Sequence, residues 1–136
     1  MRIIADTSVW SLFLRRRKEA DPPSIDLFRS AIQENRVQML GIIRQELLSG
    51  MKSEARFRRI GEILEGFPDL LAESRDHTEA ARFFNQCRRK GIQGSPVDFL
   101  ICAQAARNKM AILTEDRDFE RYARHLPISL CRSRVS

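Results

Sequence analysis

The chain begins with a short apolar run that ends abruptly in polar side chains, and this pattern constrains the fold strongly. Residues 3–5 form the run, which has the β-branched character of a buried strand, and Asp6, Thr7 and Ser8 follow it directly. Apolar residues at helical spacing come next, so the sequence predicts a turn from strand into helix at Asp6. An acid at such a turn either caps the helix or lies where open α/β sheets place their ligands. This stretch alone favours the cap.

The same alternation of short apolar runs and helical patterns continues along the chain. Further strands are predicted at residues 37–40, 110–114 and 128–130, with a minor one at 70–72. Helices are predicted at 24–35, 41–50, 53–66, 77–90 and 116–122, and a nearly all-apolar one begins at 95. Such alternation predicts an α/β fold, a three-layer α/β/α sandwich with a short parallel central sheet. At this length, residues 1–136 are expected to form a single domain.

Net charge and cysteine content indicate which partners and which cellular compartment to expect. Twenty-four Lys and Arg against eighteen Asp and Glu give a formal net charge of +6, which favours nucleic acid or an acidic protein as partner. Cys87, Cys102 and Cys131 are widely spaced, and no pair has zinc-ligand spacing, so we expect reduced thiols. We find no apolar run of membrane-spanning length and no signal-peptide pattern, and we therefore expect a cytoplasmic protein without a membrane segment.

Glu46 stands in an unusual place for a carboxylate. It follows Ile42 by four residues and Ile43 by three, so the helical pattern puts it on the face that those isoleucines bury. A carboxylate there is costly unless a cation meets it. The alternatives are that Glu46 tilts to solvent or pairs with an arginine.

Asp98 and Asp116 each begin a predicted helix. Asp98 closes a Ser-Pro-Val-Asp segment that begins at Ser95 and resembles a capping box with proline at the first helical position. Asp116 follows an apolar strand and a hydroxyl residue, and so repeats the pattern of Asp6. Capping is the plain interpretation of both acids, but it leaves room for a second role.

Taken together, four acids have a geometric consequence. The ends of parallel strands and the first turns of the following helices can meet at one edge of the sheet, and carboxylates crowded there raise each other's pKa. A hard divalent cation, Mg²⁺ or Mn²⁺, relieves that repulsion, whereas zinc is disfavoured because no histidine or cysteine lies within these motifs. His77 and His125 are expected at the surface. The candidate metal ligands and catalytic residues are Asp6, Glu46, Asp98 and Asp116.

The order of these motifs is specific although each one is weak. Residues 4–10, 46–50, 98–105 and 113–119 resemble, in order and spacing, the PIN-domain ribonucleases and, within them, the VapC toxins of toxin–antitoxin pairs. The resemblance implies a PIN-like fold with the four acids around Mg²⁺ or Mn²⁺. It also implies hydroxyl neighbours at Thr7 or Ser8 and at Thr114, and a further acid at Asp118. Cys102 stands where alanine is more usual, a change that affects no catalytic position.

The activity expected on this basis is metal-dependent endoribonuclease cleavage. Without a cysteine nucleophile or a positioned histidine, hydrolysis is expected to be metal-assisted, with water attacking in line and a carboxylate, Asp98 or Asp116, orienting it. The products should carry 5′-phosphate and 3′-hydroxyl ends. The resemblance further implies an RNA substrate, a cognate VapB-like antitoxin and a homodimer. Among several basic clusters we favour Arg15, Arg16, Arg17 and Lys18 as RNA contacts.

Other functions compete with this one. A non-catalytic PIN-like module that binds RNA or protein would lack one of the acids, and all four are present. A phosphoacceptor receiver domain would need a phosphorylatable aspartate after a central strand and a lysine after the last one, and neither can be placed. A haloacid-dehalogenase-like phosphatase would need Asp-x-Asp after the first strand, whereas Thr7 and Ser8 follow Asp6.

Overall fold

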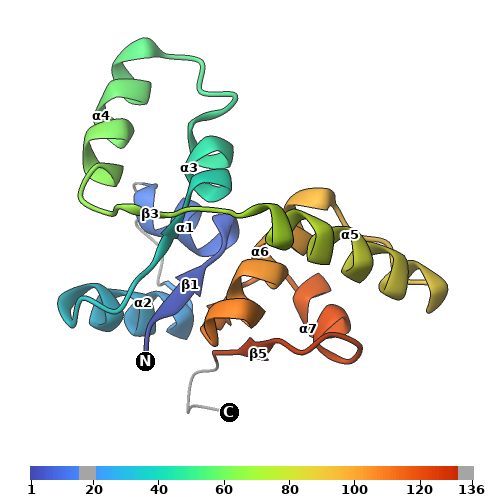
Figure 1. Ribbon diagram of the computed structural model, residues 1–136. Helices are drawn as coiled ribbons and strands as arrows, with labels where there is room; N and C mark the ends of the chain where they lie inside the picture. Colours follow the sequence, from blue (N-terminus) through green and yellow to red (C-terminus); the bar gives the residue numbers. More distant parts are fainter. Residues whose placement is uncertain (16–20, 132–136) are drawn as a thin grey trace.

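Helices and short strands alternate along the whole chain (Figure 1). The computed structural model describes residues 1–15 and 21–131. In chain order the elements are β1 Ile3–Ala5, α1 Thr7–Leu14, α2 Pro23–Gln33, β2 Met39–Leu40, α3 Gly41–Leu48, α4 Glu54–Leu64, β3 Asp69–Leu70, α5 Ser74–Arg89, α6 Pro96–Asn108, β4 Ala111–Leu113, α7 Asp118–Ala123 and β5 Ser129–Leu130.

Every strand pairing in the described chain is parallel. β1 pairs with β4 and β4 with β5, while β2 pairs with β3. A single parallel bridge between Ile3 and Val37 joins the two sheets, supported by 2.8 Å hydrogen bonds from Ile3 N to Arg36 O and from Gln38 N to Ile3 O. The strand order across the molecule is therefore β3-β2-β1-β4-β5. Because Ala5 pairs with Leu113, β1 and β4 end side by side.

The central strands are buried on both faces. All three residues of β1 and all three of β4 are buried, which requires cover above and below the sheet. Helix α1 packs against α2 and α3, and α5 packs against α6 in the most extensive helix pairing of the described chain (Figure 1). The predicted parallel α/β fold, a sheet flanked by helices, is confirmed. Within the described residues, no helix combines the length and apolarity that a membrane span requires.

Two groups of aromatic side chains contribute to the core. The Trp10 ring makes edge-to-face contacts with Phe28 and Phe67, at centroid distances of 4.8 and 5.0 Å, and so joins α1 to α2 and to the turn after α4. Phe99 of α6 packs against the Tyr122 ring of α7 at 4.9 Å. These contacts fix the helices whose first turns carry the candidate acids.

Some predicted boundaries differ from the structure. Helix α5 begins at Ser74 rather than 77, because Asp76 Oδ2 accepts a 2.9 Å hydrogen bond from the backbone N–H of Glu73 and so caps an earlier start. The minor strand is Asp69–Leu70 rather than 70–72, since these two residues pair with β2. Helix α7 begins at Asp118, two residues later than predicted: Arg117 is its N-cap residue, and the Asp116 Oδ1 atom accepts a hydrogen bond from the Asp118 N–H just before the helix.

Candidate active site

Asp6 occupies the end of β1 and serves as the N-cap of α1. Its Oδ1 accepts hydrogen bonds from Ser8 Oγ at 2.6 Å and from the Val9 backbone N–H at 3.4 Å, and its Oδ2 accepts one from Thr114 Oγ1 at 2.8 Å. Only 5% of Asp6 is exposed. The capping interpretation is therefore correct, and the same carboxylate also faces the end of β4.

Burial makes the charged form of Asp6 unfavourable. It raises the pKa of Asp6 from 3.8 to about 6; the hydrogen bonds from Ser8, Thr114 and Val9 lower that pKa, while the negative charge of Asp116 raises it. The fold thus holds a carboxylate rigidly where a negative charge is poorly solvated. A bound cation would compensate for that cost.

Glu46 lies on the exposed side of α3. Its side chain is exposed, and Ile43 and Leu47 provide the buried face of α3. The sequence left open whether Glu46 shares the buried face or tilts to solvent, and the structure shows the second alternative. Its carboxylate Oε1 accepts a 2.5 Å hydrogen bond from Thr7 Oγ1, next to Asp6 in the chain. That contact brings α3 to the start of α1.

Asp98 lies in the first turn of α6, and its carboxylate is not the N-cap of that helix. Ser95 is the N-cap, because its Oγ accepts a 3.1 Å hydrogen bond from the Asp98 backbone N–H, and Pro96 is the first helical residue. The Asp98 Oδ2 atom accepts a 2.7 Å hydrogen bond from the Tyr122 hydroxyl. Burial, followed by the charges of Asp116 and Glu46, raises the pKa of Asp98, whereas the Tyr122 hydrogen bond lowers it.

The loop after β4 is organised by hydroxyl and carboxylate oxygens. Thr114 Oγ1 accepts a hydrogen bond from the Asp116 backbone N–H at 2.9 Å, and Asp116 Oδ1 accepts one from the Asp118 N–H at 2.9 Å. Ser8 Oγ accepts a 3.0 Å bond from the Glu115 N–H, which ties α1 to this loop. The Asp118 carboxylate forms an ion pair with Arg121 on its own helix. Asp118 thus already has a cationic partner.

The candidate acids influence one another electrostatically. Asp116 raises the pKa of both Asp6 and Asp98, and Glu46 raises that of Asp98. They do not form a closed cage: in residues 1–15 and 21–131, no three His, Cys, Asp or Glu side chains are gathered closely enough to hold a metal ion. The donor set consists of oxygen atoms, and its mutual repulsion is of the kind that a hard divalent cation relieves. The oxygen donors are therefore of the type that Mg²⁺ or Mn²⁺ prefers, although the side chains are not gathered around one point.

Other residues singled out in the sequence lie outside this group. Arg15 is the C-cap residue of α1 and is exposed, whereas Arg16, Arg17 and Lys18 lie outside the described residues. His77 is exposed and His125 is partly exposed.

Sequence reasoning missed Tyr122 and Gly94. The Tyr122 side chain is fully buried, and its spacing of three from Phe119 indicates a core position but gives no sign of a polar partner 24 residues away. Gly94 permits this arrangement. A Cβ atom there would lie 2.8 Å from the Phe99 ring and closer still to the Tyr122 hydroxyl. A glycine before a capped helix was the only available signal of such a close approach.

Comparison with known proteins agrees with this architecture. The family model of the PIN domain matches residues 3–125. The chain is 29% identical over 125 residues to ribonuclease VapC11 of Mycobacterium tuberculosis and to VapC ribonuclease Mb1587 of Mycobacterium bovis, covering 90% of this chain and 92% of each relative.

Solved structures show the same fold at low sequence identity. VapBC2 from Rickettsia felis, bound to a promoter DNA fragment, superposes with a TM-score of 0.77 at 15% identity, over 96% of this chain and 98% of that chain. FitAcB from Neisseria gonorrhoeae gives 0.74 at 20% identity, over 96% of both chains. DNA-bound VapBC from Salmonella typhimurium gives 0.73 at 21% identity, over 96% and 97% of the two chains.

The parallel sheet with acids at its carboxyl edge and the match over residues 3–125 define one class: the chain belongs to the PIN domain family. Its similar relatives within that family, named above, are VapC ribonucleases.

Proposed function

We propose that this protein is an endoribonuclease dependent on Mg²⁺ or Mn²⁺ and acts as the toxin of a VapBC-type pair. The observation that carries this proposal is the state of Asp6, a 5% exposed carboxylate whose pKa burial raises to about 6, with the charge of Asp116 close enough to raise that pKa as well. Asp6, Glu46, Asp98 and Asp116 would hold the metal. When bound, such an ion lowers the pKa of a water molecule and neutralises charge on the scissile phosphate.

The protein's own residues orient the reacting groups. The hydroxyls of Ser8 and Thr114 hold one oxygen each of Asp6. The hydroxyl of Tyr122 holds one oxygen of Asp98. Asp98 or Asp116 orients the attacking water, and because water is the nucleophile the products carry 5′-phosphate and 3′-hydroxyl ends.

Cleavage of mixed RNA by the purified protein tests this proposal directly. We expect cleavage with Mg²⁺ or Mn²⁺, none with EDTA, and none for Asp6→Ala, whose fold is checked by circular dichroism. Ser24→Ala, at another buried polar position distant in sequence from the acids, serves as the matched control and should cleave normally. A folded Asp6→Ala protein that still cleaves would overturn the assignment. RNA binding without cleavage would instead identify a non-catalytic module.

We also propose a VapB-like antitoxin and a second copy of this chain as partners. The solved relatives include VapBC and FitAB complexes, which supports the antitoxin. An apolar groove of about 460 Å³ between α3, α5 and α6, lined by Ile42, Phe84, Val97 and Leu100 among others, supports the homodimer. Light scattering should give twice the 15.8 kDa chain mass, and Phe84→Glu should return it to 15.8 kDa. A monomeric wild type would contradict the homodimer.

A further inference from the structure

Helix α3, which carries Glu46, has few local interactions that would stabilise it. It has eight residues, its N-cap Leu40 offers no side-chain hydrogen bond, and only Ile43 and Leu47 are buried. Helices this short are unstable in isolation and depend on tertiary contacts. Glu46 itself is exposed, and its 2.5 Å hydrogen bond from Thr7 does not fix the whole helix.

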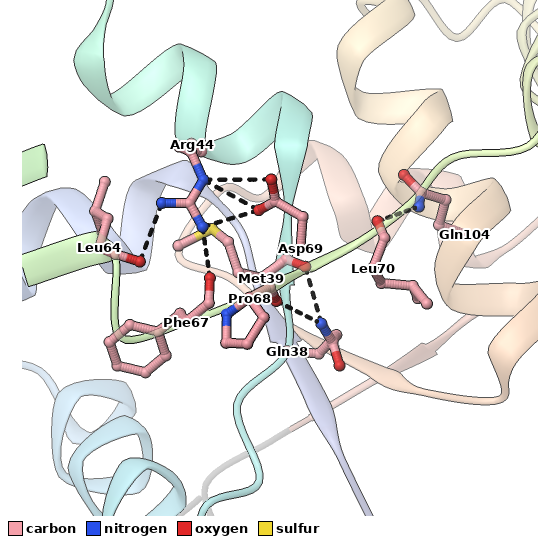
Figure 2. A network of polar contacts seen from close by, with 9 residues as sticks. All are labelled: Gln38, Met39, Arg44, Leu64, Phe67, Pro68, Asp69, Leu70 and Gln104. Carbon is pink, nitrogen blue, oxygen red and sulfur yellow. Dashed lines mark hydrogen bonds and ion pairs between the residues drawn. The ribbon is translucent and has the colours of Figure 1, made fainter.

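Arg44 supplies contacts that hold this helix. Its Nη1 donates to Leu64 O at 3.0 Å and its Nη2 to Phe67 O at 2.5 Å, which occupies carbonyls at the end of α4 and in the turn beyond it. Its Nε and Nη2 donate to Asp69 Oδ1 at 3.1 and 2.9 Å (Figure 2). All three guanidinium nitrogens are used, in the planar fork that only arginine provides. The Arg44 and Asp69 side chains are 24% and 29% exposed, so solvent screens the pair less than it would a surface pair.

These contacts link α3 to β3, and β3 is linked through β2 back to the start of α3. Asp69 begins β3, which pairs in parallel with β2 through Met39, and β2 leads without a break into Gly41. A Cβ atom on Gly41 would lie 3.6 Å from Asp69 Oδ2, so this carboxylate also lies beside the N-terminus of α3. The helix is therefore held at its start by β2 and along its side by the Arg44 contacts.

Arg44 and Glu46 project in nearly opposite directions. Two residues correspond to about 200° of rotation around a helix. One side of α3 is therefore bound to α4 and β3 through Arg44, while the other presents Glu46 to Thr7 of α1.

We propose that Arg44 is a positioning residue for Glu46: by fixing α3 against Asp69 and the end of α4, it sets where the Glu46 carboxylate meets the acids at the sheet edge. This inference rests on the proposed function, because Glu46 is taken there as a metal ligand. It assigns Arg44 no contact with substrate or metal.

A double-substitution cycle tests the inference. Arg44→Lys keeps the charge but cannot reproduce the fork, and we expect a single-turnover RNA cleavage rate about tenfold lower at saturating RNA. Arg44→Lys should also weaken Mn²⁺ binding: the Mn²⁺ concentration that half-saturates the protein, measured by calorimetry, should rise. In the Glu46→Gln background, Arg44→Lys should change the rate less than about twofold, since its effect passes through Glu46. In metal-free protein, amide hydrogen exchange in residues 41–48 should become faster.

A second ion pair provides the matched control. Arg107 donates to Asp76 from Nε at 2.6 Å and from Nη2 at 2.8 Å, at the far end of α6 from Asp98. Arg107→Lys should lower stability while leaving the cleavage rate per folded molecule and the exchange of residues 41–48 unchanged. Equal effects of Arg44→Lys in both backgrounds would overturn the positioning role while leaving ribonuclease activity intact. Unchanged exchange in residues 41–48 would overturn it whether or not the wild type cleaves RNA.

Discussion

At the scale of single residues, Asp6 combines several hydrogen bonds with an environment that disfavours its charge. Three hydrogen bonds hold the carboxylate, yet burial raises its pKa to about 6, so the folded chain disfavours its ionised form. The same atoms that cap α1 are therefore under electrostatic strain at neutral pH. An N-cap requires only an oxygen acceptor, and an asparagine would serve. The negative charge is thus not explained by capping.

This strain predicts a pH dependence of folding without metal. Because the pKa of Asp6 is higher in the folded than in the unfolded chain, its contribution to stability is fully present below about pH 4 and is lost as the pH rises through about 6. The difference amounts to about 2 to 3 kcal/mol. We expect Asp6→Asn to remove this decline and to be more stable than wild type at pH 7.5.

Urea unfolding in EDTA at several pH values measures the effect as the difference between wild type and Asp6→Asn, in which other titrating groups cancel. Addition of Mn²⁺ should stabilise the wild type more than the variant. Parallel curves for the two proteins between pH 4 and 7.5 would contradict the strained carboxylate.

At the scale of elements, the site depends on how short helices are held against one another. Helix α6 presents Asp98 from its first turn, and α7 reaches it through Tyr122, whose ring packs on Phe99. Ser8 and Thr114 tie α1 to the loop after β4 in the same way. No single element contains the site.

The contact between α6 and α7 is testable with Tyr122→Phe. Loss of the hydroxyl removes the 2.7 Å hydrogen bond to Asp98 Oδ2 but keeps the buried ring. We expect a stability loss of about 1 to 2 kcal/mol and slower cleavage, because the Asp98 carboxylate is then free to rotate. Thermal unfolding and single-turnover rates measure the two effects.

Phe119→Leu serves as control for Tyr122→Phe, because Phe119 is a fully buried residue of the same helix without a polar contact to Asp98. It should lose stability without a change in cleavage rate per folded molecule. A Tyr122→Phe protein with the wild-type rate would show that the hydroxyl does not orient Asp98.

At the scale of the whole molecule, the acids occupy one sheet edge while the chain as a whole carries a net charge of +6. Phosphates of an RNA strand must therefore approach a locally acidic site, which favours contacts to basic residues around it. Residues 15–18 follow α1, the helix that Asp6 caps, and Arg15 is exposed.

This distribution predicts a change in the salt dependence of RNA binding. Replacing Arg15, Arg16, Arg17 and Lys18 by glutamine should weaken binding and reduce the slope of log affinity against log salt by about 0.7 for each phosphate that the protein no longer neutralises. Fluorescence anisotropy on the Asp6→Ala background avoids cleavage. Replacing Arg58 and Arg59 of α4 serves as control. An unchanged slope in the 15–18 variant would remove this cluster from the RNA-binding surface.

Much of this architecture follows from local pattern. Three-residue apolar strands followed by hydroxyl and acid, at Asp6 and again at Asp116, indicate a parallel sheet with its polar turns on one edge, because parallel strands end on the same side. Ser95 and Pro96 mark the start of α6, and the structure begins the helix there. Helix-boundary chemistry is local, so neighbouring residues are enough to predict it.

Contacts between segments distant in the sequence could not be predicted from local pattern. The exposure of Glu46 depends on the rotation of α3, which Arg44 sets through Asp69, 25 residues away. The Tyr122 hydroxyl reaches Asp98 only because α7 packs on α6 over Gly94. A one-dimensional pattern specifies which face of a helix is apolar, but its final rotation and neighbours follow from packing of the whole chain. Local sequence therefore accounts for which acids reach the edge, and three-dimensional packing determines how each carboxylate is held.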